Sequence, residues 1–280
     1  MGAPRVFVTG PVSWNTMVDL DRLPDPRPQM VIARGHRDRL GGTSAGKALN
    51  LADLGCAVTL RTQVGSDEYA ARILRALQVP GVAVLAEHAH GPSERHLNLM
   101  AADGRRLSIY LDLPAPAAEV HGDAARRALA DCDVAVVDLA DSARPWLDES
   151  RRLGKPVWCD LHDYDGAASF HRPWVDAADV VFLSDDAMAA PAPFMRACLD
   201  RGASLVVCTQ GARGALAVTA RGEWHRPAET VADVVDVNGA GDAFFAGFLV
   251  RHLAGGSVEE CLAAGHRQAA RAVRSPGLAP

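Results

Sequence analysis

Short, almost entirely apolar runs alternate with longer segments of helical periodicity along most of this chain, and this alternation leaves few folds open to it. Six runs have the length and composition of β-strands: 5–9, 57–63, 133–138, 156–160, 180–183 and 205–209. Helical patterns lie between them, at 44–54, 68–77, 123–130, 145–153 and 187–201. Apolar strands separated by helices predict an α/β fold with a doubly wound, mostly parallel sheet and helices on both faces.

A sheet of this kind also predicts where a ligand binds. Ligands of parallel sheets lie outside the carboxyl ends of the strands, so the loops after Thr9, Asp160, Leu183 and Thr209 are the first candidates. With 280 residues the chain is long enough for one large α/β domain with a well-buried core. We expect residues 1–280 to form a single domain, with 275–280 as a loose tail.

Two segments, near 12–40 and 93–113, interrupt the alternation. The first combines VDLDRLPDPRP with the charged run VIARGHRDRL, and the second alternates around Asp103-Gly104, which is a hairpin signal. We expect the two segments to pair into a small antiparallel sheet that stands off the main domain. Such a sheet serves either as a lid over an active site or as an edge for dimerisation, and both roles are compatible.

Composition excludes several classes of protein. A formal net charge of −5 argues against a nucleic-acid-binding surface. Six scattered cysteines without a C-x-x-C pair indicate buried thiols in a reducing compartment rather than disulfides or a zinc site. The first residues show no charged leader with a long apolar core, and no apolar run reaches the roughly 18 residues of a membrane span. We expect a cytoplasmic protein without nucleic-acid or membrane partners.

The most informative stretch is DVNGAGDAFFAGF, residues 236–248. Its turn, Gly239-Ala240-Gly241, leads into a helix, and small residues at a helix N-terminus leave backbone N–H groups exposed to an anion. Asp242 adds a carboxylate beside that cradle. Phosphoryl transfer to an alcohol needs both, since a carboxylate accepts the hydroxyl proton while amides hold the phosphate. The alternative is that Asp242 only caps the helix.

This stretch closely resembles the C-terminal signature, approximately D-T-x-G-A-G-D, of the ribokinase-like (PfkB) family of carbohydrate and nucleoside kinases. Val237 stands where that signature usually has Thr. Residues 209–214, TQGARG, resemble the T-x-G-x-x-G turn that borders the ATP site, and GGTSAGKALNLADLG, 41–55, occupies the place of the N-terminal signature G-G-x-x-x-N. The resemblance implies a ribokinase-like fold with a small β lid, and ATP-dependent phosphorylation of a primary hydroxyl on a sugar or nucleoside.

The resemblance also implies roles for individual residues. The general base is Asp242, with the backbone amides of Gly239, Ala240 and Gly241 stabilising the moving phosphoryl group. The nucleotide-binding residues are Thr209, Gly211, Gly214, Ser184 and Asn238. The acceptor-binding residues are Asn15, Gly41, Gly42, Gly46, Lys47 and Asp242. The ions are Mg²⁺ near Asp185 and Asp186, and a monovalent cation such as K⁺ at Asp236. Dimerisation through the lid occurs in this family.

The chain departs from the family pattern near the expected magnesium. Relatives have an Asn-x-x-Glu element that organises water around Mg²⁺, and this chain has Ser184-Asp185-Asp186-Ala187 instead. In one interpretation, Asp185 or Asp186 replaces that element, because hard cations bind carboxylates as ligands. Alternatively, the acidic pair belongs to an ordinary helix N-cap with acidic residues in its first turn. Both interpretations stay open.

The acceptor site departs as well. Asn15 stands where many relatives have an Asp, and it keeps one acceptor while adding donors for a hydroxyl. Gly46 aligns with the Asn of the N-terminal signature. Lys47 either supplies charge for an acidic or phosphorylated acceptor or is exposed to solvent on its helix, and we expect exposure.

Four alternative interpretations concern the function of the chain or the role of a motif. Residues 41–47 match the P-loop pattern G-x-x-x-x-G-K, but Ala48 lacks the required hydroxyl and we expect no strand directly before the glycines. For the group Asp160, His162, Asp163, Asp165 and His171, we favour support of the Mg²⁺-nucleotide over a transition-metal site, and a solvated loop stays open as the alternative. A catalytically weak binding or regulatory member of the fold is less favoured, because Asp242 is retained. An oxidoreductase is disfavoured because Thr9-Gly10-Pro11 opens no G-x-G-x-x-G turn.

Overall fold

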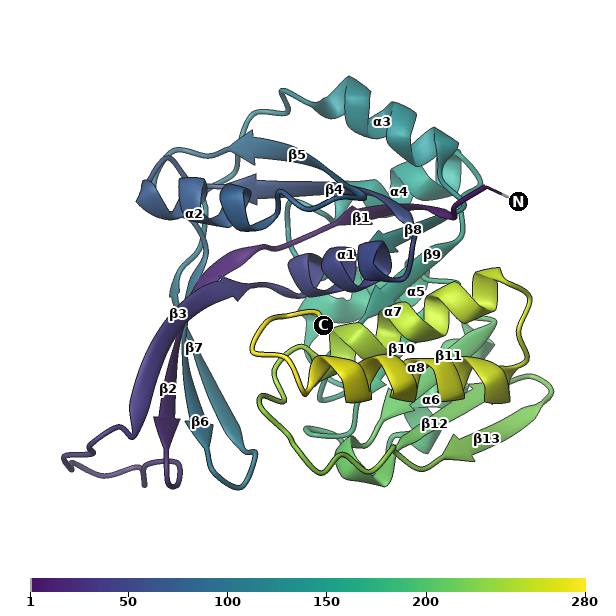
Figure 1. Cartoon of the computed structure of the whole chain (residues 1–280). Coiled ribbons are helices and arrows are strands. Elements are labelled where there is room, and N and C mark those ends of the chain that lie inside the picture. The colour runs from purple at the N-terminus through teal and green to yellow at the C-terminus, as the bar shows by residue number, and fades with distance from the viewer. Residues whose placement is uncertain (1) are drawn as a thin grey trace.

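A computed structural model describes residues 2–280, which form two β-sheets and eight α-helices (Figure 1). The large sheet has nine strands, in the order β13 (Gly222–Arg226), β12 (Ala215–Thr219), β11 (Leu205–Thr209), β10 (Val180–Ser184), β9 (Val157–Asp160), β8 (Val134–Val137), β1 (Arg5–Thr9), β4 (Ala57–Val64) and β5 (Val82–His88). Neighbours from β11 to β5 are parallel, whereas β12 pairs antiparallel with both β11 and β13. The predicted mostly parallel sheet is confirmed.

Helices cover both faces of this sheet. One hydrophobic core joins it to α1 (Thr43–Asp53), α2 (Glu68–Ala76), α7 (Ala240–Leu253) and α8 (Val258–Ala272). The other core joins it to α3 (Gly122–Asp131), α4 (Pro145–Arg152), α5 (Arg172–Ala177) and α6 (Ala192–Asp200). Side chains of β1 alternate between the two, since Val6 and Val8 belong to the first core and Phe7 to the second. This alternation is why the strands read as continuous apolar runs.

Several elements differ from the sequence prediction. The edge strand β5 was not predicted, because its side chains are mostly half-buried and show no clean apolar run. Helix α8 was not predicted either, although Ser257 and Glu260 form the capping box that marks its start. The helix expected from residue 187 begins only at Ala192, since Pro191 and Pro193 stand where proline favours a first turn.

The two interrupting segments form a second sheet, which we call the small sheet. Its order is β3 (Gly35–Gly41), β2 (Ser13–Leu20), β6 (Arg95–Ala101) and β7 (Arg106–Asp112), and it stands off the large sheet at the lower left of Figure 1. Strands β6 and β7 pair as the hairpin predicted around Asp103-Gly104. The small sheet is mixed rather than antiparallel, because β2 and β6 run parallel. The chain passes through β4, α2 and β5 between them, and such a crossover permits parallel pairing.

All six cysteines are buried and unpaired, as the sequence predicted. Among residues 2–280, no helix combines the length and the apolar character that crossing a membrane requires.

Candidate active site

The start of α7 is an open anion cradle at the carboxyl edge of the large sheet. Gly239 has a φ of +86°, a left-handed conformation that turns the chain into the helix. The N–H of Ala240 donates to the carbonyl of Val237 at 3.2 Å, whereas those of Gly241 and Asp242 donate to no group within residues 2–280. These two N–H groups and the helix dipole favour a negatively charged ligand.

Asp242 lies in the first turn of α7 against the start of α1. Its Oδ1 accepts a hydrogen bond of 2.6 Å from Thr43 Oγ1, and its side chain is 13% exposed. A Cβ at position 46 would collide with the other oxygen, Oδ2, so Gly46 is what allows α1 to approach this closely. Burial raises the pKa of Asp242, and the charges of Lys47 and His162 offset only part of that rise.

Lys47 is completely buried, so the prediction of a solvent-exposed lysine is wrong. Its Nζ donates to Asp138 Oδ1 and to Thr43 Oγ1, both at 2.6 Å. The same ammonium lies 3.5 Å from Asp242 Oδ1 and 3.5 Å from Asp160 Oδ2. Burial alone would lower the pKa of Lys47, but the three carboxylates outweigh it and raise the pKa above its ordinary value. The lysine is thus a fixed internal cation.

Asp138 and Asp160 complete this cluster, and the sequence reasoning gave Asp138 no role. Asp138 follows β8 and also accepts a 2.7 Å hydrogen bond from Ser44 Oγ. Asp160 ends β9 and accepts a 2.9 Å hydrogen bond from the backbone N–H of His162. Burial would raise the pKa of Asp160, but His162 and Lys47 lower it overall. The available signal was that both aspartates end apolar strands at the edge where ligands bind.

Of the His and Asp residues expected to cluster after β9, His162 and Asp160 lie together, with Nδ1 of the histidine 3.6 Å from Oδ2 of the aspartate, whereas Asp165 and His171 make other contacts. Asp160 faces Lys47, whereas Asp165 accepts hydrogen bonds from the next turn of backbone and the His171 ring lies 4.5 Å from that of Tyr164. No group of three His, Cys, Asp or Glu side chains within residues 2–280 has the geometry of a metal site. His162 has a φ of +54°, an uncommon backbone conformation outside glycine.

The P-loop alternative is not supported. Strand β3 does end at Gly41, directly before the glycines, contrary to our expectation. However, the ammonium of Lys47 is fully buried and donates to Asp138 and Thr43, so it is not free to contact a phosphate group.

Residues expected to bind the nucleotide meet at the edge formed by β10 and β11. Ser184 and Thr209 are register partners at the ends of these strands, and the turn 211–213 follows at once. Gly211 has a φ of +57°. Gly214 has a φ of +106°, and a Cβ there would collide with the carbonyl of Arg226. Glycine is therefore favoured at both positions by the backbone conformation, and its small size also leaves space beside the ends of β10 and β11.

The acidic pair beside this edge is not a helix N-cap, because α6 begins at Ala192 and is preceded by Pro191. Asp185 is paired with the guanidinium of Arg213 and lies 3.4 Å from Gln210 Nε2. Asp186 is exposed and accepts a 3.0 Å hydrogen bond from Ser184 Oγ. Its carboxylate is therefore the better fit for a hydrated Mg²⁺, which is bound through few protein ligands.

Residues expected to bind the acceptor lie where the small sheet joins α1. Asn15 is buried on β2, its Oδ1 accepts a 2.7 Å hydrogen bond from Ser13 Oγ, and its Nδ2 donates to no group within residues 2–280. A Cβ at position 41 would collide with that amide, so Gly41 leaves the room it occupies. Gly42, with a φ of +91°, precedes α1 and the Thr43 that contacts Asp242. The structure thus brings Asn15 and Asp242 to one region.

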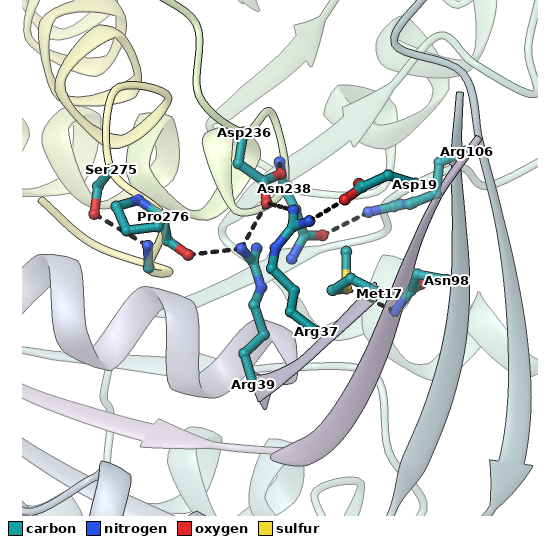
Figure 2. Close-up of polar contacts among 11 residues, drawn as sticks. Met17, Asp19, Arg37, Arg39, Asn98, Arg106, Asp236, Asn238, Ser275 and Pro276 are labelled. Carbon is teal, nitrogen blue, oxygen red and sulfur yellow. Dashed lines mark hydrogen bonds and ion pairs between the residues drawn. The ribbon is translucent and has the colours of Figure 1, made fainter. Parts of the chain in front are cut away.

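Asp236 lies at the other end of the loop that leads to Asp242, and it contacts the small sheet (Figure 2). Its Oδ2 accepts hydrogen bonds from Arg37 Nη2 at 2.8 Å and Arg39 Nη1 at 2.6 Å. Its Oδ1 accepts the backbone N–H of Asn238 at 2.8 Å, and Arg106 donates to the Asn238 side chain at 3.0 Å. Both carboxylate oxygens are engaged, so these residues do not fit the monovalent cation that the family resemblance implies.

The tail of the chain is part of this region, so the prediction of a loose tail is wrong. Leu278 is buried, and its carbonyl accepts a 2.8 Å hydrogen bond from the buried Asn50. The carbonyl of Pro276 accepts a 2.7 Å hydrogen bond from Arg39. Residues 276–278 therefore cover the loop that carries Gly239.

The sequence of this chain is similar to those of known kinases. The model of the "pfkB family carbohydrate kinase" family matches residues 172–280. The chain is 35% identical over 265 residues to acarbose 7(IV)-phosphotransferase of an Actinoplanes species, covering 92% of this chain and 88% of that protein. It is 30% identical over 276 residues to ATP-dependent ribose-1-phosphate kinase of Halopiger xanaduensis, covering 92% and 88%.

Solved structures are similar over the same length. The microbiome-derived acarbose kinase Mak1 superposes with a TM-score of 0.86 at 27% identity, covering 100% of this chain and 95% of that chain. Arabidopsis thaliana ribokinase, complexed with ribose and ATP, superposes with a TM-score of 0.79 at 21% identity, covering 99% and 96%, which shows a shared fold.

A fold of this class, an open helix N-terminus and a carboxylate in its first turn define a phosphotransferase of the ribokinase type. The chain belongs to the pfkB family of carbohydrate kinases and is an ATP-dependent kinase of this family.

Proposed function

We propose that this protein transfers the γ-phosphoryl group of ATP to a hydroxymethyl group of a sugar, with Asp242 as the general base. The position of Asp242 carries the proposal. Its carboxylate lies in the same helical turn as the free N–H groups of Gly241 and Asp242, so one turn supplies the base and the donors for phosphoryl charge.

The surroundings of Asp242 keep its carboxylate in position and stabilise its ionised form. Thr43 holds Oδ1 through a 2.6 Å hydrogen bond, while Oδ2, which packs against Gly46, accepts no hydrogen bond within residues 2–280. Oδ2 is therefore the oxygen that accepts the acceptor hydroxyl proton. Lys47 holds positive charge 3.5 Å away, which stabilises the ionised carboxylate against the effect of burial.

Nucleotide binding falls to the edge beside β10 and β11. ATP supplies the phosphoryl group, and Mg²⁺ neutralises the charge of its phosphates when bound. Thr209, Gly211, Gly214, Ser184 and Asn238 border the nucleotide in this proposal. Asp186 and, less well, the already paired Asp185 hold the hydrated Mg²⁺.

The inner face of the small sheet, which carries Asn15, supports a sugar acceptor. On neighbouring strands this face carries His96 and Asn98, register partners of Asn15 and Met17, with Ser108 donating to Asn98 at 2.6 Å. The His96 and Tyr110 rings lie 4.0 Å apart. Hydroxyl-rich ligands need such donors and acceptors, and the curated relatives named above act on acarbose and ribose-1-phosphate.

The opposite, outer face of the small sheet favours a homodimer. Leu107, Ile109 and Leu111 alternate on β7 and are each more than 40% exposed, and Leu97 and Leu99 lie opposite them on β6. Contiguous apolar side chains at a surface mark an association site. Sedimentation velocity is expected to show a dimer that Ile109→Glu converts to a monomer, and a monomeric parent protein would refute this role.

The first experiment measures ADP release from Mg²⁺-ATP with pentoses, hexoses, phosphosugars, pseudo-oligosaccharides and nucleosides, with Asp242→Asn as control. Turnover on one group of sugars, lost in the variant, is the expected result. Turnover on nucleosides alone would refute the sugar acceptor. ATP binding without turnover on any acceptor would favour the catalytically weak binding protein, for which the pairing of Asp185 with Arg213 is the supporting observation.

A further inference from the structure

The loop before α7 is tied to the small sheet by charge. Asp236 is almost completely buried, with 3% of its side chain exposed, and its Oδ2 is shared by the guanidinium groups of Arg37 and Arg39. Both arginines come from β3, and Figure 2 shows them reaching across to the loop. The carboxylate thus meets two fixed positive charges at the place where the family resemblance implies a mobile one.

The charges of this cluster balance without any added ion. Arg37 also donates to Asp19 Oδ2, so two guanidinium groups face two carboxylates. A further cation at Asp236 would meet two positive charges within a few ångströms and find both carboxylate oxygens engaged. Without the two arginines, the same two carboxylates would carry an unbalanced negative charge.

Arg39 is held in place at an energetic cost. Only 11% of its side chain is exposed, and its Nε and Nη2 are buried without a hydrogen-bond partner within residues 2–280. Unsatisfied buried donors are unfavourable, and native proteins retain few of them. This unfavourable burial is offset by the hydrogen bonds that Nη1 of Arg39 donates to the Asp236 carboxylate and to the carbonyl of Pro276.

We propose that Arg37 and Arg39 supply from within the chain the positive charge that some members of the family take from a monovalent cation at the position of Asp236, so that this kinase needs no K⁺. The charge steadies the loop that ends in the cradle of Gly239 and Gly241. It is also available only when the small sheet lies against the loop. The activity readout of this inference rests on the proposed kinase function, whereas its stability readout does not.

The test compares KCl, NaCl and choline chloride at constant ionic strength. Initial rates and thermal unfolding midpoints are measured for the parent protein, for the double variant Arg37→Met/Arg39→Met, and for Arg105→Met. Arg105 is the matched control, because this exposed arginine lies in the hairpin loop between β6 and β7 and, within residues 2–280, its side chain pairs only with Asp103 of the same loop.

The parent protein and Arg105→Met are expected to show the same rate and midpoint in all three salts. The double variant is expected to lose at least tenfold in rate in choline chloride, to recover at least threefold in KCl, and to unfold at a higher temperature in KCl than in choline chloride. If it does not fold, the single variant Arg37→Met replaces it, since the Arg37 side chain is 38% exposed.

Three results would overturn the inference. The first is a parent protein activated threefold or more by K⁺, and the second is a double variant that keeps the parent rate in choline chloride. The third is a loss that no monovalent cation reverses in rate or midpoint, which would make the arginines a structural latch. Absence of turnover in every sample would refute the proposed function instead, while the midpoints would still test this inference.

Discussion

Asp236 and Asp242 lie at the two ends of the same short loop, yet the charges of their carboxylates are neutralised by side chains from different parts of the molecule. Asp242 faces Lys47, which comes from α1 against the large sheet and is fully buried. Asp236 faces Arg37 and Arg39, which come from the small sheet and are partly accessible. The partner of Asp242 is therefore fixed in the core, whereas the partners of Asp236 depend on where the small sheet lies. We propose that one end of the loop serves the chemistry and that the other couples the loop to the small sheet.

The largest expected effect lies at the Asp242 end. Asp242→Asn keeps the shape and the hydrogen bond with Thr43 but cannot accept a proton. We expect kcat to fall by about 10³-fold, within the usual contribution of a general base, while the Kd for ATP stays nearly unchanged. Calorimetry with ATP and steady-state rates measure the two quantities. An unchanged kcat would remove Asp242 from the role of base.

Lys47→Met should damage both stability and pH dependence. Removing the ammonium leaves Asp138, Asp160 and Asp242 buried without their shared cation, and breaking a buried pair costs about 3–5 kcal/mol. Denaturant unfolding measures this loss, and Lys155→Met, the same substitution at the other lysine of the chain, is the control.

The pH profile of the same variant gives a second readout. The raised pKa of Asp242 means that kcat/KM is lost, as pH falls, at a higher pH than for an ordinary carboxyl group. Because Lys47 lowers the pKa of Asp242, its removal should move that acid limb to still higher pH. If Lys47→Met does not fold, Lys47→Met/Asp138→Asn removes one charge of each sign. A limb that stays in place would show that Lys47 supports the fold without influencing the base.

The two ends of the loop also differ in how far the sequence predicts them. The turn 239–241 and Asp242 are contiguous, so their pattern is visible in one short stretch. The burial of Lys47 was missed because its partner Asp138 is 91 positions away and is brought near only by the order of the strands. The contact between Arg37 and Asp236 spans 199 positions and needs the small sheet to lie against the loop. Local periodicity predicts six of the nine strands of the large sheet, but it does not predict which charges meet across two sheets.

The smallest expected effect in this comparison concerns the small sheet rather than the loop. Asn15→Ala removes the amide whose Nδ2 has no partner within residues 2–280, while Ser13 loses an acceptor for its hydroxyl. One neutral hydrogen bond to a sugar hydroxyl contributes about 0.5–1.5 kcal/mol, so we expect the acceptor KM to rise roughly two- to twelvefold. Asn15 has no part in the proton transfer, so kcat should change little. Asn15→Asp, which keeps an acceptor, should restore part of the affinity. A variant that lowers kcat and leaves KM unaltered would assign Asn15 to the chemical step together with Asp242. It would contradict the proposal that the small sheet only binds the acceptor.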